Sequence, residues 1–516
     1  MPEGRIAADL ERGPVSLATY GRVFAYSLVK RGMPIPVTLK AAGRAATAPG
    51  LSGVPPACAP AADIADIVLN PTGEKPAIDA GQQAWHDRFL VADLHADTLL
   101  WHRGLREYSS WGQVDLNRLT LGNVGLQVFT MPTRVPVPSR SEPCTSENNF
   151  DPAPLLAFSS GWSAATWSSS YQRAVTQAEV FRQAVVQKRR SGIELVQIRE
   201  IADLEAWLAR RFAEPDRQNR NLIAGLLGVE GAHAFAPDLG SEFDTLVRVY
   251  GLRVVGPMHH FSNVYGESSE ACKGDRPGLT EPGRRLIREL FRRNMIVDLA
   301  HASTQSIRDA VAIAYDNRRP VLASHTGVKR HLERVYAGTT DPTQLQAIRR
   351  AMSDEEIAMV AGTGGTTGII YWKDQIGEAR VDNVVEAIMQ AYCDLAWREG
   401  TTPPGGFHRI ENASKHVSLG SDWDGSALNA IDAAHVAAIT TRLRARRLAE
   451  DDIANIVGRN ACRVVGQSLS GGTFADAQAL CSRYGAPAAS VQRKDDAGRA
   501  ERQQVCRELG MLRPAR

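Results

Sequence analysis

Short apolar runs that alternate with amphipathic stretches constrain the fold of this chain more than any other feature. Eight such runs can be counted, each four to eight residues long. They are residues 89–94, 125–129, 222–229, 253–257, 295–299, 320–323, 368–371 and 416–419. Between them, apolar side chains recur at helical spacing, as in Leu286, Ile287, Leu290 and Phe291. This alternation is typical of parallel strands joined by helices, and eight strands predict an α/β fold of the (β/α)8, TIM-like barrel type.

The barrel accounts for only part of the 516 residues. We expect it to span residues 85–470, with an N-terminal extension over 1–84 and a C-terminal extension over 471–516. The extensions show no sustained helix or strand period, apart from one expected helix at 496–509. Residues 132–171 are rich in Pro and Ser and too long for a plain connection, so they predict a loop over one face of the barrel.

Charge and hydrophobicity exclude several classes of partner. The 60 basic residues nearly balance the 57 acidic ones, and the net charge of +3 is too small for the basic field that nucleic acids require. The uncharged stretch 45–62 holds four prolines and the apolar run 23–29 is too short, so no transmembrane segment is evident. Because no clear signal peptide is recognisable, the compartment, bacterial cytoplasm or periplasm, stays open.

The seven cysteines carry little information by themselves. Their number is odd, the chain is long and no C-x-x-C pair occurs. Their spacing therefore implies neither a disulfide framework nor a cysteine zinc site.

Side chains that can bind metals follow directly after most of the apolar runs. In a barrel, the C-terminal ends of the strands converge on one mouth. The residues at these ends are His95, Asp97, Glu230, His259, His260, His301, His325, Asp422 and Asp424. Histidine makes up only 12 of the 516 residues, yet it follows four of the eight runs. A single histidine at a strand end is more often a structural residue, but the set as a whole predicts a metal centre.

The ligand count favours two metal ions. Three imidazoles and two carboxylates suit zinc and exceed one tetrahedral shell, so one carboxylate must bridge two ions. Two metals can hold a water between them, lower its pKa and polarise a carbonyl oxygen. Such a centre is typical of enzymes that hydrolyse amides or esters.

Seven motifs resemble the membrane (renal) dipeptidase family, the M19 metallopeptidases, and in particular its longer bacterial members. Within residues 85–466 they occur in the family's order: VADLHADTLLW, GVEG, HHFSN, VDLAHAS, SHTGV, RAMSDEE and GSDWDG. The resemblance implies a zinc-dependent dipeptidase, in which a metal-bridging hydroxide hydrolyses the peptide bond of small dipeptides. Family members also accept a D-residue at the C-terminal position.

The resemblance also implies a ligand set of five residues. His95 and Asp97 would bind one zinc ion, and His301 and His325 would bind a second. Glu230 would bridge the two ions, in agreement with the ligand count above.

Other strand-end residues would handle the substrate. By resemblance, His259 steadies the developing oxyanion, with His260 as the alternative. Asp422 faces the substrate amine or passes a proton to the leaving nitrogen, a task for a positioned acid or base. We expect Asp424 to hold a ligand histidine in its tautomer.

The substrate carboxylate would be bound by Arg350, which matches the arginine of the family's R-N-[LV]-S-D pattern. The connection from His325 to Arg350 is longer than in the family, so residues 329–346 are interpreted as an insertion. The alternative interpretation makes Arg350 a solvated residue just before a helix N-cap at Ser353.

Two other functions stay open at this stage. The same centre could act on another small amide, a cyclic amide or an ester, although many such barrels use His-x-His where this chain has His95-Ala96-Asp97. A barrel retired from catalysis could bind a partner through the insertion that contains Trp162 and Trp167, but the complete ligand set argues against this. The sequence does not fix the oligomeric state, and a homodimer is one option.

Overall fold

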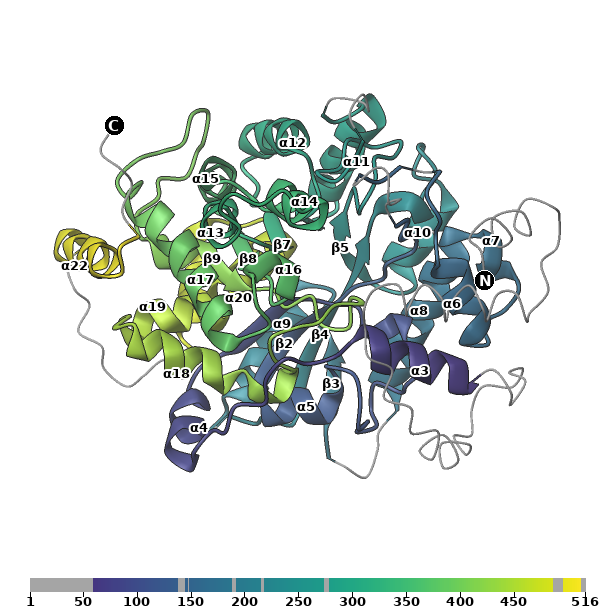
Figure 1. Cartoon of the computed structure of the whole chain (residues 1–516), viewed down its shortest axis with the longest axis horizontal. Helices are drawn as coiled ribbons and strands as arrows, with labels where there is room; N and C mark the ends of the chain where they lie inside the picture. Colours follow the sequence, from purple (N-terminus) through teal and green to yellow (C-terminus); the bar gives the residue numbers. More distant parts are fainter. Residues whose placement is uncertain are drawn as a thin grey trace. The chain divides into compact units, whose positions relative to one another are not determined.

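Parallel β-strands form the centre of the fold (Figure 1). The structure, a computed structural model, describes residues 59–137, 144–146, 148–187, 192–214, 218–272, 278–485 and 495–511. Within these ranges the strands are β1 (Val91–Ala96), β2 (Val124–Phe129), β3 (Glu194–Gln197), β4 (Leu222–Glu230), β5 (Leu252–Gly256), β6 (Ile296–Val297), β7 (Leu322–Thr326), β8 (Thr366–Ile369) and β9 (Val417–Leu419). Each of the eight predicted runs overlaps one strand, and β3 is an additional strand that the apolar pattern did not predict.

The strands form one curled sheet. One part has the order β1-β2-β4-β5-β6, with β3 on the first half of β4, and the other has the order β7-β8-β9. A parallel bridge between Asp298 and Leu322 joins β6 to β7, and one between Ala96 and Trp423 joins β1 to the residues after β9. These links confirm the predicted barrel, because every strand of the series has a neighbour on both sides.

Helices surround the strands in Figure 1. Those that follow the barrel strands are α5 (Leu116–Leu121), α9 (Ile201–Arg211), α10 (Ser241–Arg248), α11 (Glu281–Arg292), α12 (Thr304–Asn317), α15 (Asp354–Gly362), α17 (Val381–Ala396) and α20 (Asn460–Ser470). Further helices include α16 (Lys373–Ile376), α18 (Ala437–Ala445), α19 (Glu450–Ala454) and α21 (Phe474–Ser482). The apolar face predicted for α11 is buried, and Ser353 caps α15 in a capping box with Glu356, as its sequence indicates.

The two insertions are more regular than the sequence predicts. Residues 132–171 are not simply a loop, because they contain α6 (Ala153–Ser159), α7 (Ala165–Ser168) and the start of α8 (Ser170–Val186). Pro152 stands at the start of α6, where its missing N–H costs no helical hydrogen bond. The second insertion, residues 329–346, forms α13 (Lys329–Val335) and the first half of α14 (Pro342–Arg350).

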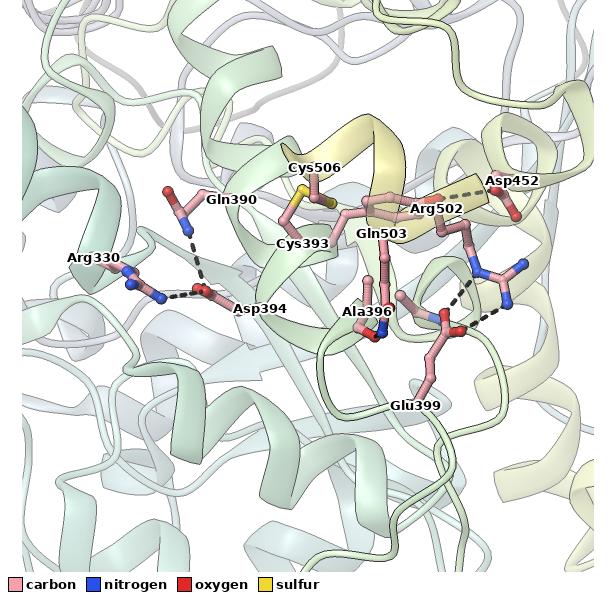
Figure 2. Close-up of a disulfide and its surroundings, with 12 residues drawn as sticks. Arg330, Gln390, Cys393, Asp394, Ala396, Glu399, Asp452, Arg502, Gln503 and Cys506 are labelled. Carbon is pink, nitrogen blue, oxygen red and sulfur yellow. Dashed lines mark hydrogen bonds and ion pairs between the residues drawn. A yellow bond between two sulfur atoms is a disulfide. The ribbon is translucent and has the colours of Figure 1, made fainter. Parts of the chain in front are cut away.

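Three disulfides correct the expectation from the cysteine spacing. They join Cys144 to Cys272, Cys393 to Cys506, and Cys462 to Cys481. The first two pairs lie 128 and 113 residues apart in the sequence, so only the folded chain brings them together. Figure 2 shows the second pair, which fastens α22 (Asp495–Glu508) to α17.

Parts of both predicted extensions pack on the barrel. The described N-terminal part contains α3 (Ala59–Leu69) and α4 (Ala80–His86), whereas residues 1–58 lie outside the described ranges. The helix expected at 496–509 corresponds to α22. The division at residues 84 and 470 stays a prediction. Among the described helices, none is both long and apolar enough to cross a membrane.

Candidate metal centre

The five predicted metal ligands converge at the C-terminal ends of the strands. The carboxylate of Glu230, which ends β4, lies at the centre of the group. Its Oε1 atom is 2.9 Å from the Nε2 atom of His301, 3.3 Å from that of His325 and 3.6 Å from that of His95. Glu230 therefore lies between the two pairs of ligands that the sequence assigns to separate metal ions.

Two further carboxylates lie close to His95. The Nε2 atom of His95 is 3.4 Å from Oδ1 of Asp97 and 3.9 Å from Oδ1 of Asp422. The structure thus forms two groups that share His95, one with Glu230 and His325 and one with Asp97 and Asp422. All these residues are buried.

Ser324 sets the tautomer of two of the imidazoles. Its hydroxyl oxygen lies 2.8 Å from Nδ1 of His325 and 3.2 Å from Nδ1 of His95. The single hydroxyl proton is donated to Asp298 at 2.5 Å, so this oxygen accepts from both rings. Each ring therefore carries a proton on Nδ1 and turns Nε2 toward the cluster, in the orientation that binds metals.

Two buried polar atoms of the cluster lack a hydrogen-bond partner. Nε2 of His95 and Oε1 of Glu230 are buried without a hydrogen-bond partner. Burial and the neighbouring Asp97 raise the pKa of Glu230 well above its usual range. Although burial alone would lower it, the carboxylates of Glu230 and Asp97 raise the pKa of His95 to about 10. Divalent cations would satisfy these atoms together, so the donor set fits the metal centre that the sequence predicts.

Comparisons with known proteins identify the family of this chain. The family model described as membrane dipeptidase (peptidase family M19) matches residues 80–393, well over half of the chain. The chain belongs to this family. The matched range includes all five predicted metal ligands and Arg350, whereas Asp422 lies beyond its end.

Curated relatives of this M19 protein include two fungal dipeptidases. An uncharacterized dipeptidase of Schizosaccharomyces pombe is 26% identical over 254 residues, 48% of this chain and 53% of its own. A dipeptidase of Clonostachys rogersoniana is 26% identical over 246 residues, 47% of this chain and 55% of its own. The chain thus spans about half the length of the curated relatives it matches. Because both are fungal, the narrower resemblance to longer bacterial members is not confirmed.

Solved structures show the same fold. A metallopeptidase from Rhodobacter sphaeroides, liganded with a phosphinate mimic of the dipeptide L-Ala-D-Ala, matches with a TM-score of 0.50 and 19% identity over 74% of this chain and 99% of its own. A probable dipeptidase from Pseudomonas aeruginosa matches with a TM-score of 0.52 and 16% identity over 76% of this chain and 98% of its own.

Two adjacent histidines follow β5 in this M19 protein and face different partners. Nε2 of His259 lies 3.1 Å from Oε2 of Glu230, and its Nδ1 donates to the carbonyl oxygen of Arg134 at 3.1 Å. His260 is closer to solvent and places Nδ1 2.9 Å from Oε2 of Glu270. The contact with Glu230 favours His259 as the residue beside the reacting group, which stays a prediction.

Glu270 is a buried residue of the site that was not among the predicted ones. Besides His260, its carboxylate accepts from Nδ1 of His301 at 3.2 Å and from the side-chain amide of Gln346 at 3.2 Å. Burial alone would raise the pKa of Glu270, but the two histidines hold it well below its usual range. Glu270 lies in a loop without a regular pattern, and its partners are distant in the sequence, so only the fold reveals its place.

Arg350 is not the solvated residue of the alternative interpretation. It ends α14 with a side chain that is 2% exposed, because α13 and α14 fold back toward the barrel mouth. Its Nη2 atom lies 3.2 Å from Nε2 of His301. The Nε and Nη1 atoms have no hydrogen-bond partner, although Nε lies 3.8 Å from Oε2 of Glu270.

Asp422 and Asp424 follow β9, and their side chains contact different residues. Burial and the nearby Asp97 raise the pKa of Asp422 to about 7, although His95 opposes this shift. The expectation that Asp424 holds a ligand histidine is wrong. Its carboxylate instead forms an ion pair with Arg103 and accepts hydrogen bonds from the hydroxyl of Thr98 at 2.8 Å and the backbone N–H of Gln113 at 2.7 Å.

Proposed function

We propose that this protein is a zinc-dependent dipeptidase with two zinc ions per chain. The observation that carries the proposal is the buried cluster in which Nε2 atoms of three histidines surround one carboxylate oxygen of Glu230. Nitrogen and carboxylate ligands suit zinc. When bound, two zinc ions lower the pKa of a water held between them and polarise a peptide carbonyl.

The chain's own residues are proposed to hold the ions as the sequence predicts. His95 and Asp97 would hold one ion, His301 and His325 would hold the other, and Glu230 would be shared by both. Asp298 supports this arrangement through Ser324, and Thr130 donates to Asp97 at 2.6 Å. These hydrogen bonds orient the ligands before a metal arrives.

Arg350 and Asp422 are proposed to select dipeptides over longer chains. A dipeptidase must bind both free termini of its substrate. Arg350 contacts His301, a proposed ligand of one ion, whereas Asp422 adjoins His95, a proposed ligand of the other. The guanidinium of Arg350 would therefore lie near one ion and bind the substrate carboxylate, and the carboxylate of Asp422 would lie near the other and bind the substrate amine.

We assign proton transfer to Asp422 and stabilisation of the oxyanion to His259. A pKa of about 7 allows Asp422 to accept a proton and to give it to the leaving nitrogen near neutral pH. Because Nδ1 of His259 donates to the carbonyl oxygen of Arg134, His259 would steady an oxyanion only as an imidazolium with a second proton on Nε2, which burial opposes by lowering the pKa of His259 well below its usual range. Glu230, 3.1 Å away, is the group that shares this proton in the metal-free protein.

Metal analysis tests the centre itself. Protein reconstituted with zinc should bind about two ions per chain, since five ligands exceed one tetrahedral shell. Glu230→Gln should weaken both sites, because a bridging ligand serves two ions, whereas His95→Ala should mainly empty one. Glu205→Gln, at an exposed position on α9, serves as the control. Full activity with one ion or none would contradict the binuclear proposal.

Amidated substrates test the choice of dipeptides. L-Ala-D-Ala should be hydrolysed with a much higher kcat/KM than its C-terminal amide, because the amide cannot pair with a guanidinium. Arg350→Lys should raise KM for the free dipeptide roughly tenfold or more with unchanged zinc content, since an ammonium cannot form two parallel hydrogen bonds. Arg349→Lys, at the exposed neighbouring position, should leave KM unchanged. Equal kcat/KM for the free and amidated dipeptides would favour an amidohydrolase of other small amides.

A further inference from the structure

The loop that carries Asp422 adopts an unusual backbone conformation. We define the Asp422 loop as residues 420–430. Asp422, Asp424 and Ser426 have φ angles of 62°, 61° and 60°, in the left-handed region that favours glycine. Such residues persist where the surrounding structure holds them, so the contacts of this loop determine where the Asp422 side chain lies.

One support of the loop is a buried ion-pair chain. Asp424 pairs with the guanidinium of Arg103, and the Nε atom of Arg103 donates to Oδ2 of Asp66 at 2.7 Å. Asp66 lies on α3, and its side chain is 2% exposed. Buried charges of this kind remain in place only when each has its partner, so the three side chains fix one another.

A second support starts from the same residue of α3. The side-chain amide of Asn70 donates to Oδ1 of Asp66 at 2.8 Å, and its oxygen accepts from the backbone N–H of Ser426 at 2.9 Å. The backbone N–H groups of Gly73 and Glu74 donate at 2.8 Å to carbonyl oxygens of the Asp422 loop. Residues 66–74 are therefore bonded to the Asp422 loop along its second half.

We propose that α3 and the residues after it are part of the active site, and that Asp66 is a positioning residue for Asp422. Both oxygens of Asp66 act as acceptors, one for Arg103 and one for Asn70. An asparagine at this position could satisfy only one of them. If Asn70 then turned its amide, its NH2 group would face the N–H of Ser426, two donors in opposition. The defect would reach the Asp422 loop without any change in the loop's own sequence.

This segment lies outside the range of the family match, which begins at residue 80. The inference about catalysis rests on the proposed dipeptidase function, because Asp422 is assigned there to the substrate amine. The inference about the loop conformation does not depend on that function. An experiment with one readout for each therefore separates the two.

The first arm measures hydrogen exchange of peptides from the Asp422 loop in the full chain. Asp66→Asn should exchange faster there than wild type, whereas Asp63→Asn on the same helix should match wild type, because Asp63 faces His102 instead. Asn70→Ala removes the acceptor for Ser426 and the donor to Asp66 but keeps the ion pair between Asp66 and Arg103, and it should show the same direction if Asp66→Asn does not fold. Unchanged exchange in both Asp66→Asn and Asn70→Ala would overturn the proposal.

The second arm measures kcat/KM for L-Ala-D-Ala together with zinc content. Asp66→Asn should lower kcat/KM by about 10- to 100-fold with zinc retained. The same change in an Asp422→Asn background should have little further effect, since the residue it positions is already altered. An equal loss in both backgrounds would contradict positioning through Asp422. If wild type hydrolyses no dipeptide, the proposed function fails, and the exchange arm alone decides the inference.

Discussion

At the scale of single residues, the site depends on side chains that are not ligands. Ser324 has one proton and two lone pairs, and this inventory is enough to orient His95 and His325 at once. Glu270 does the same for His301. As a consequence, Nε2 atoms and carboxylate oxygens face one another. In the metal-free protein, protons must therefore occupy the positions where cations would bind.

Zinc binding should therefore release protons. Because the pKa of His95 is about 10 in the metal-free protein, this ring is protonated at pH 8 and must lose a proton to bind zinc. The apparent zinc affinity should rise with pH by about tenfold per unit for each proton displaced, and level off above the pKa of His95. Calorimetric titrations at pH 8 in two buffers of different ionisation enthalpy give the number of protons.

The matched control is His435→Asn, which alters a histidine outside the cluster and should release as many protons as wild type. Binding without proton release at pH 8 would contradict the protonated state assigned to His95.

At the scale of elements, the sequence pattern predicted the barrel strands because they are buried on both faces and read as continuous apolar runs. The apolar pattern did not predict β3, because this strand has only four residues, of which Glu194 and Gln197 are polar and Glu194 is exposed. The candidate metal ligands could be proposed from the sequence because each lies at or just after the C-terminal end of a strand. Arg350 was predictable only by resemblance, since its burial depends on how α13 and α14 fold back.

Other parts of the site could not be predicted from local patterns. The helices that lie wholly within 132–171 are short, with 7 residues in α6 and 4 in α7. The place of Glu270 depends on the remote Thr145, whose backbone N–H donates to the carbonyl oxygen of Glu270 at 2.9 Å. Cys144 and Cys272 close this region covalently. Such pairings depend on the folded chain. They cannot be predicted from local sequence patterns, because the paired residues are far apart in the sequence.

At the scale of the whole molecule, disulfides secure the C-terminal part of the chain. Cys393–Cys506 fastens α22 to α17, where Arg502 also forms a two-fold ion pair with Glu399 at 2.7 and 2.8 Å (Figure 2). Cys462–Cys481 joins α20 to α21. Three disulfides are typical of proteins that fold in an oxidising compartment. Neither of these two C-terminal disulfides contains a residue of the proposed site, so we expect them to contribute to stability.

The two C-terminal disulfides should differ in the stability they provide. Cross-links act largely by restricting the unfolded chain, and the restriction grows with the length of the closed loop. Cys393 and Cys506 are separated by 113 residues, Cys462 and Cys481 by 19. Replacing both members of the first pair by Ala should lower the free energy of unfolding by about 5 kcal/mol, and replacing both members of the second should lower it by about 3 kcal/mol.

Denaturant unfolding of both double variants, without reductant, measures the difference. Activity toward dipeptides below the transition should match wild type in each variant, because the metal ligands lie on other elements. With dithiothreitol, which reduces the disulfides, wild type should lose stability. The stabilities of wild type and of the two variants should then become similar. If the variant without the shorter loop were the less stable one, the native contacts of α20 and α21, rather than restriction of the unfolded chain, would dominate the effect.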